Sequence, residues 1–218
     1  MSIAPILLFT TIYLYLCNWF QIKTFFHALI KPKERITTIH DSWIIKTVKK
    51  KANLQLRKIL IFETEKLFGF MPSLPIDPKI VLSRGMYTSF TKDELEWVIL
   101  HEAAHCVFWH GLKLGIAQVL LLALGMYVSQ STQNIFIASV IAIIFSILYV
   151  QYARHLEREA DVYSIQKVGN IHGVISANKK LRDHYSLPEK SIVRRLFYYG
   201  LLPSERILLA LEYMHKAK

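Results

Sequence analysis

Two long parts of the sequence lack charged side chains. Residues 1–22 and 114–153 contain no Lys, Arg, Asp or Glu, although these residues make up 20% of the chain. A polar stretch at residues 129–134 divides the longer run into segments of about 112–128 and 135–153. As helices these segments would be about 25–28 Å long, close to the roughly 30 Å of a bilayer core. The pattern predicts three transmembrane helices and disfavours a hairpin buried in a soluble core.

Cysteine is scarce as well, with Cys17 and Cys106 the two in the chain. One lies in the first apolar segment and the other in a predicted helix, so no disulfide framework is indicated. The N-terminal segment has no Lys or Arg at its start and no small-residue cleavage pattern after Phe20, which argues against a signal peptide. We therefore expect residues 1–22 to be retained as a first span.

Acidic residues are few, with 16 Asp and Glu against 27 Lys and Arg, which gives a net charge of +11. The sequence has no nucleic-acid-binding motif, so we expect no nucleic-acid partner. Attraction of basic residues to an anionic inner leaflet explains the charge better. Lys and Arg follow the first and third spans, whereas the tip at 129–134 has none. This distribution predicts that residues 23–112 and 154–218 are cytoplasmic and that the N-terminus lies outside.

Residues 101–105 read His-Glu-Ala-Ala-His. On a helix, positions i and i+4 share one face, so His101 and His105 can bind one metal ion. Glu102 is then placed to deprotonate the attacking water, as in zinc hydrolases. A chance occurrence of the motif is the alternative, and the surrounding helical pattern argues against it.

That helical pattern has a clear start. Thr91 and Glu94 match a capping box, and no Pro or Gly interrupts the following apolar pattern before Gly111. In a continuous helix His110, five residues after His105, would point away from the metal-binding face, so we do not expect it to be a ligand.

A catalytic zinc usually has three protein ligands and one open position. Glu157 and Asp161 are again i and i+4 on one helix face, while Glu159 points away from both. We predict Glu157 as the third ligand and Asp161 as an acceptor that orients a ligand imidazole. The alternative is a solvent-exposed charged turn, where most such residues are found.

The HEAAH motif, the Glu157–Asp161 segment and a late Pro-Ser-Glu-Arg-Ile at residues 203–207 resemble the membrane metallopeptidases of the HtpX and CAAX prenyl protease type. These are gluzincins, zinc peptidases whose third ligand is Glu. The resemblance covers about residues 40–215. It implies one zinc ion per chain, held by the ligands already named, and a short strand at residues 78–83 before the motif helix.

Two features that this family often has are missing from the sequence. There is no Asn-Ala-Phe-Ala segment, which forms the edge strand that pairs with substrate in the family, and no His just before Pro203 to stabilise the transition state. The sequence offers four other candidates for that stabilising role: Arg206, Tyr198, Tyr199 and His184.

One further helix is predicted from apolar residues at helical spacing. It would cover about residues 41–68, place Lys49–Lys51 on its solvated face, and end at Gly69 and Pro72.

Together these observations predict a mainly α integral membrane protein with about three transmembrane helices. A cytoplasmic, helical, gluzincin-like catalytic domain would carry a small β element before the HExxH helix. The expected divisions are a first span at 1–22, catalytic parts at 23–112 and 154–218, and a transmembrane hairpin at 113–153.

The predicted function is zinc-dependent endopeptidase activity on proteins or peptides at the cytoplasmic membrane surface, with membrane-protein quality control as a hypothesis. The alternative is a catalytically idle zinc-binding scaffold or regulator in the membrane. Cleavage of lipidated peptides is suggested by the resemblance alone.

Overall fold

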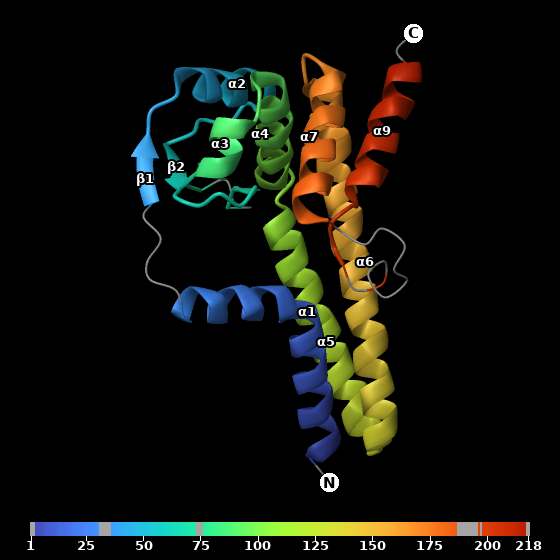
Figure 1. The fold of residues 1–218 in the computed structure, drawn as a ribbon. Helices are drawn as coiled ribbons and strands as arrows, with labels where there is room; N and C mark the ends of the chain where they lie inside the picture. Colours follow the sequence, from blue (N-terminus) through green and yellow to red (C-terminus); the bar gives the residue numbers. More distant parts are fainter. Residues whose placement is uncertain (1–2, 31–35, 73–75, 187–195, 197, 217–218) are drawn as a thin grey trace. The chain divides into compact units, whose positions relative to one another are not determined.

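The computed structural model describes residues 3–30, 36–72, 76–186, 196 and 198–216 (Figure 1). The chain divides into two compact units. The first unit comprises Met1–Lys33, Lys113–His155 and Ser191–Tyr199. The second unit comprises Glu34–Leu112, Leu156–Lys190 and Gly200–Lys218.

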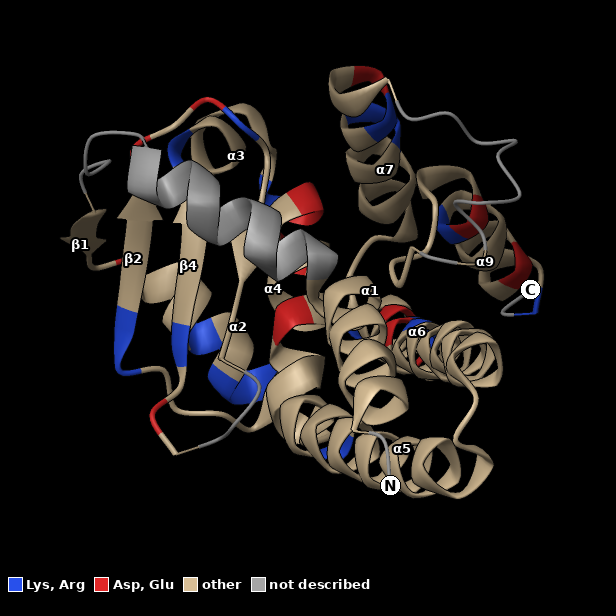
Figure 2. Cartoon of the chain, turned by 90° about the horizontal axis from the view of Figure 1, so that it is seen from below, with Lys and Arg blue, Asp and Glu red and all other residues tan. Residues whose placement is uncertain are grey.

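The first unit contains α1 (Ala4–Ile30) and most of α5 (His110–Thr132) and α6 (Ile135–Lys167). Helices α5 and α6 are long and apolar enough to cross a membrane, whereas the apolar part of α1, Ala4–Asn18, is shorter. Figure 2 shows almost no charged residues on the parts of α5 and α6 that belong to this unit. The described residues thus provide two candidate spans, and the count of three remains a prediction.

Small residues allow α1 to pack closely against the α5–α6 pair. Phe9 and Tyr13 of α1 form a buried cluster with Ala138 and Ala142 of α6. A Cβ atom added at Gly125 of α5 would lie only 1.9 Å from Cζ of Phe9. Helices in membranes associate through such close backbone approaches, because lipid tails provide little hydrophobic driving force between helices.

The second unit contains a four-stranded sheet in the order β1-β2-β4-β3. The strands are β1 (Ile36–Ile39), β2 (Lys58–Phe62), β3 (Gly69–Phe70) and β4 (Lys79–Ser83). Strand β2 is parallel to β4, while β1 and β3 pair antiparallel with β2 and β4. The strand expected at 78–83 coincides with β4, and the sheet is larger than the small element expected from the sequence.

The prediction of one helix over residues 41–68 was wrong. Helix α2 (Ser42–Ala52) ends at Asn53, whose φ of 54° is in the left-handed region that Asn tolerates at helix ends. The chain then forms β2, in which Ile59 and Ile61 are buried and alternate with more exposed residues. The apolar residues after Asn53 therefore follow the two-residue period of a strand rather than the face of a helix.

Helix α4 (Lys92–Val107) is the central helix of the second unit, and it contacts both α2 and α7 (Ile171–Tyr185). The predicted capping box is confirmed. The backbone N–H of Thr91 donates to Oε2 of Glu94 at 2.7 Å, and the Glu94 N–H donates to Oγ1 of Thr91 at 3.4 Å. The short helix α3 (Arg84–Ser89) precedes α4, and α9 (Pro203–Lys216) packs on α7.

Candidate metal centre

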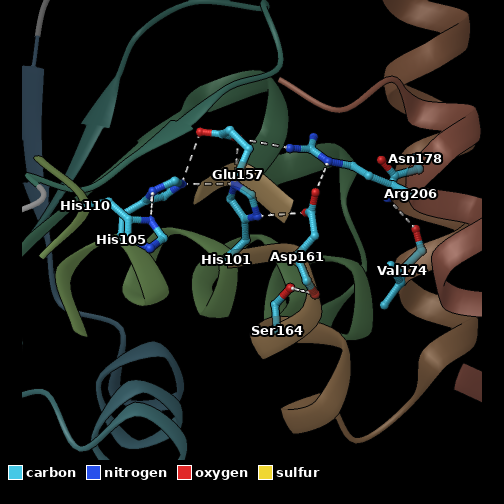
Figure 3. Close-up of polar contacts among 9 residues, drawn as sticks. All are labelled: His101, His105, His110, Glu157, Asp161, Ser164, Val174, Asn178 and Arg206. Carbon is cyan, nitrogen blue, oxygen red and sulfur yellow. Dashed lines mark hydrogen bonds and ion pairs between the residues drawn. The ribbon is translucent and has the colours of Figure 1, made fainter. Parts of the chain in front are cut away.

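Three side chains from two helices converge in the second unit (Figure 3). Nε2 of His101 lies 3.3 Å from Nε2 of His105, both on α4. The carboxylate of Glu157, on α6, approaches both rings, with Oε2 3.5 Å from Nε2 of His101 and Oε1 3.4 Å from Nε2 of His105. The structure therefore brings together the three side chains predicted to be metal ligands, which could hold a metal ion.

The spacing of these donor atoms fits a zinc ion. Tetrahedral zinc has its nitrogen and oxygen ligands at about 2.0–2.1 Å, which puts neighbouring ligand atoms about 3.3–3.4 Å apart. The three separations in the structure are 3.3, 3.4 and 3.5 Å. Converging lone pairs of two imidazoles and a carboxylate would otherwise repel one another, so a cation or a shared proton is needed between them.

The ring of His101 is oriented by a contact at its Nδ1 atom. Nδ1 of His101 lies 2.9 Å from Oδ1 of Asp161, as expected from the i, i+4 spacing on α6. Nε of Arg206 in turn donates to Oδ2 of Asp161 at 2.8 Å, and its Nη2 lies 3.3 Å from Oε2 of Glu157. The Arg206 guanidinium also lies 5.5 Å from the Trp97 ring. One partly buried arginine thus contacts both carboxylates that face His101.

His105 is oriented by a residue that the sequence did not indicate. Nδ1 of His105 lies 2.9 Å from Nδ1 of His110, and Nε2 of His110 lies 3.1 Å from Oε2 of Glu159. A continuous helix would have turned His110 away, but α4 ends at Val107 and Trp109 has a φ of 56°. No breaker residue stands before Gly111, so the sequence carries no signal for this break.

The Glu102 side chain, on α4, lies near the edge strand β3. Burial raises the pKa of the Glu102 carboxyl to about 7, and the backbone N–H of Met71, directly after β3, opposes this rise only in small part. A Cβ atom added at Gly69 would lie 3.7 Å from Cγ of Glu102 and 2.9 Å from Cγ1 of Val98. Glycine thus allows β3 to approach the motif helix closely.

The two histidines differ in the proton affinity of their rings. Burial alone would lower the pKa of His101, but the carboxylates of Asp161 and Glu157 raise it well above its ordinary 6.5. Burial and the neighbouring His101 lower the pKa of His105 to about 4. Without metal, His101 holds the shared proton and His105 is neutral at pH 7, so metal binding would release a proton.

The other three candidates for stabilising the transition state have different recorded contacts. His184 is on the exposed surface of α7, with its ring packed edge-on against Tyr185 at a centroid distance of 4.9 Å. Tyr198 and Tyr199 stack on each other at a centroid distance of 5.7 Å and belong to the first unit. Arg206, the fourth candidate, contacts the predicted ligand Glu157 and also Asp161.

Curated proteins similar to this chain include bacterial proteases. The protease HtpX of Vibrio cholerae is 23% identical over 168 residues, which covers 65% of this chain and 58% of the relative. HtpX of Pasteurella multocida is 27% identical over 165 residues, which covers 65% of this chain and 57% of the relative. The chain thus spans less than two thirds of the length of these relatives.

A solved structure has a similar fold. The crystal structure of S. mikatae Ste24p matches with a TM-score of 0.63 and 18% sequence identity, covering 94% of this chain and 62% of that one. At this identity the likeness concerns the fold. Together with the HtpX relatives, it confirms the resemblance to peptidases of the HtpX and CAAX prenyl protease type.

A family model identifies the chain more directly than either comparison. The model described as peptidase family M48 matches residues 37–210, a range that contains the HEAAH motif, Glu157, Asp161 and Arg206. Because this match covers most of the sequence and every side chain that converges on the metal centre, the chain belongs to peptidase family M48.

Proposed function

We propose that the protein is a zinc-dependent endopeptidase that cleaves proteins or peptides at a membrane surface. The observation that carries this proposal is the convergence of His101, His105 and Glu157 at the separations that tetrahedral zinc requires. Three protein ligands leave a fourth position open, as in catalytic rather than structural zinc sites. Membership of a peptidase family supports the same conclusion.

The roles of the residues follow from their positions. Bound zinc would polarise the attacking water and the scissile carbonyl. Glu102, next to His101 on the same helix, would accept the proton of the water and then donate it to the leaving amine. Burial raises the pKa of Glu102 to about 7, which suits a group that must both accept and release a proton near neutral pH.

Strand β3 supplies a surface for the substrate. Within the described sheet β3 is an edge strand, and it lies beside Glu102 at Gly69. An extended peptide can add to such an edge through backbone hydrogen bonds, which bind it with little dependence on its sequence. The Asn-Ala-Phe-Ala segment of the family is missing, but we propose that Gly69–Phe70 takes the same place.

We propose that the protein crosses the membrane three times, with its N-terminus outside and its catalytic residues at the cytoplasmic surface. The two candidate spans α5 and α6 and the distribution of Lys and Arg support this topology. Helix α6 contains both an apolar stretch that could cross a membrane and the predicted ligand Glu157. A site so close to a span favours membrane proteins as substrates, in agreement with the hypothesis of quality control.

The first test compares wild type with Glu102→Gln and Glu157→Ala after purification in detergent. Zinc content is measured by elemental analysis, and casein cleavage is measured in parallel. We expect about one zinc per chain in wild type and Glu102→Gln, loss of zinc in Glu157→Ala, and cleavage by wild type alone, because Glu102 acts on the water and not on the metal.

Other outcomes would each remove one part of the proposal. Wild type that binds zinc but cleaves neither casein nor an unfolded membrane protein would favour the idle scaffold. Full zinc in Glu157→Ala would place the third ligand elsewhere. Cleavage by Glu102→Gln would exclude Glu102 as the base.

A further inference from the structure

We propose that His110 and Glu159 form a hydrogen-bonded chain that fixes the tautomer and orientation of His105, making both of them positioning residues of the metal centre. The inference rests on the proposed function in one respect, namely that Nε2 of His105 binds the metal. It assigns a role to two side chains that take no part in the chemistry proposed above.

The contacts are short and the central member of the chain is buried. Nδ1 of His105 lies 2.9 Å from Nδ1 of His110, and Nε2 of His110 lies 3.1 Å from Oε2 of Glu159 (Figure 3 shows the first contact). The His110 side chain is 1% exposed, while that of Glu159 is 36% exposed. The hydrogen-bonded chain therefore runs from Nδ1 of His105 through the buried ring of His110 to the Glu159 carboxylate, which is in contact with solvent.

The direction of each hydrogen bond follows from the metal. A metal at Nε2 of His105 uses the lone pair of that nitrogen, so the proton of the neutral ring must be on Nδ1. Nδ1 of His105 then donates, and Nδ1 of His110 must accept. His110 consequently carries its own proton on Nε2, where the Glu159 carboxylate accepts it. Each ring nitrogen in the chain has one role, and the three residues fit together in a single arrangement.

The backbone and a neighbouring ring hold His110 in place. The left-handed Trp109, with a φ of 56°, separates α4 from α5 and makes His110 the first residue of α5. The ring of Phe108 stacks on that of His110 at a centroid distance of 5.6 Å and an interplanar angle of 22°. Because the ring plane is held by stacking, Nδ1 and Nε2 point in fixed directions, as a positioning residue requires.

The two ligand imidazoles are supported in different ways. His101 faces a carboxylate directly, since Oδ1 of Asp161 lies 2.9 Å from its Nδ1. His105 faces another imidazole, and the carboxylate of Glu159 stands one residue further out. A partner on the second nitrogen fixes the tautomer of a ligand histidine and raises its basicity. Loss of His110 would leave His105 without the contact that Asp161 gives to His101.

The experiment compares four purified full-length variants with wild type. His110→Leu removes the acceptor and keeps an apolar side chain in the buried position. His110→Asn restores an acceptor, because the amide oxygen of Asn can occupy the place of Nδ1. Glu159→Ala removes the outer carboxylate alone. His172→Leu is the matched control, since His172 is an exposed residue of α7.

Zinc affinity is measured by competition with a chelator, and the visible absorption of the Co²⁺-loaded protein reports the ligand geometry. Replacing such a supporting residue typically weakens metal binding about 10–100-fold, and we expect a loss in this range for His110→Leu. His110→Asn should bind close to wild type, Glu159→Ala should show a smaller loss than His110→Leu, and His172→Leu should be unchanged. The Co²⁺ spectrum of His110→Leu should shift, which a role in packing alone would not produce.

The outcomes separate this inference from the proposed function. Wild type without zinc overturns the proposed function. If wild type binds zinc and His110→Leu binds it with equal affinity and an unchanged Co²⁺ spectrum, the proposed hydrogen-bonded chain is overturned. Equal losses in His110→Asn and His110→Leu overturn the role of His110 as acceptor. If circular dichroism shows that His110→Leu does not fold, the test rests on Glu159→Ala. Zinc affinity equal to wild type in Glu159→Ala would then overturn the proposed hydrogen-bonded chain.

Discussion

At the scale of single residues, the contacts of Arg206 distinguish between two roles, stabilising the transition state and supporting metal binding. The sequence makes it a candidate for stabilising the transition state. In the structure its Nε donates to Asp161 and its Nη2 lies 3.3 Å from Oε2 of Glu157. A guanidinium engaged with two carboxylates is suited to holding them in place for the metal. We therefore expect Arg206 to act mainly on metal binding.

Arg206→Leu tests that expectation. Without the guanidinium, Glu157 and Asp161 lose a shared partner and become free to turn, so zinc affinity should fall about 10–100-fold. Zinc affinity by chelator competition and cleavage at saturating zinc are measured together, with Arg182→Leu, an exposed arginine on α7, as the control. Unchanged zinc affinity with a lower turnover number would instead assign Arg206 to the transition state.

Residue-level prediction from the sequence succeeded where geometry is local. His101 and His105, and likewise Glu157 and Asp161, are four residues apart on one helix, and this spacing alone places each pair on one face. It missed the contact between His110 and His105, because the left-handed conformation of Trp109 has no sequence signal. A bulky residue adopts that conformation only when the surrounding structure imposes it.

At the scale of elements, the sequence indicated where α4 begins more accurately than where α2 ends. Thr91 and Glu94 form the expected capping box, which depends on two residues three positions apart. The end of α2 depends on Asn53, and Asn is a weaker stop signal than Gly. The sheet was largely missed because β2 pairs with β4, some twenty residues later, and neither segment alone indicates its partner.

The capping box gives a prediction for stability against pH. The Glu94 side chain is 3% exposed, and its Oε2 lies 2.7 Å from Nζ of Lys180. Burial opposes ionisation of Glu94, but Lys180 and the Thr91 backbone N–H lower its pKa below the ordinary 4.5. Because the folded pKa is lowered, the charge stabilises the fold above pH 4.5, and this stabilisation is lost as the pH falls through the folded value.

Glu94→Gln should therefore be less stable than wild type near neutral pH, by about 1 kcal/mol once the exposure of Lys180 is considered. The difference should shrink as the pH falls below 4.5 and disappear once Glu94 is protonated, because the wild type then also loses the charge. Thermal unfolding of both proteins across this pH range measures the difference in stability. Glu65→Gln, at an exposed position, is the control, and a difference that does not vary with pH would contradict the prediction.

At the scale of the whole molecule, the arrangement of the chain across the membrane is the main expectation that follows from charge. The segment between α5 and α6 carries no Lys or Arg, whereas α2 carries Lys49, Lys50 and Lys51 in its last turn. Cytoplasmic loops are enriched in Lys and Arg, so the α5–α6 tip should lie outside and α2 inside. This expectation depends on the sequence alone, because charge bias is a property of insertion and not of the folded contacts.

Cysteine labelling tests the topology directly. Cys17→Ser removes the more exposed of the two native thiols, and Cys106 is buried. In this background, Gln130→Cys at the tip should react with a membrane-impermeant maleimide in intact cells, because the tip faces the outside. Lys50→Cys on α2, which is also an exposed position, should react only after the cells are permeabilised. The opposite pattern would place the metal centre outside and reverse the proposed access of substrates. Labelling of both positions in intact cells would mean that the α5–α6 pair does not cross the bilayer as two separate spans.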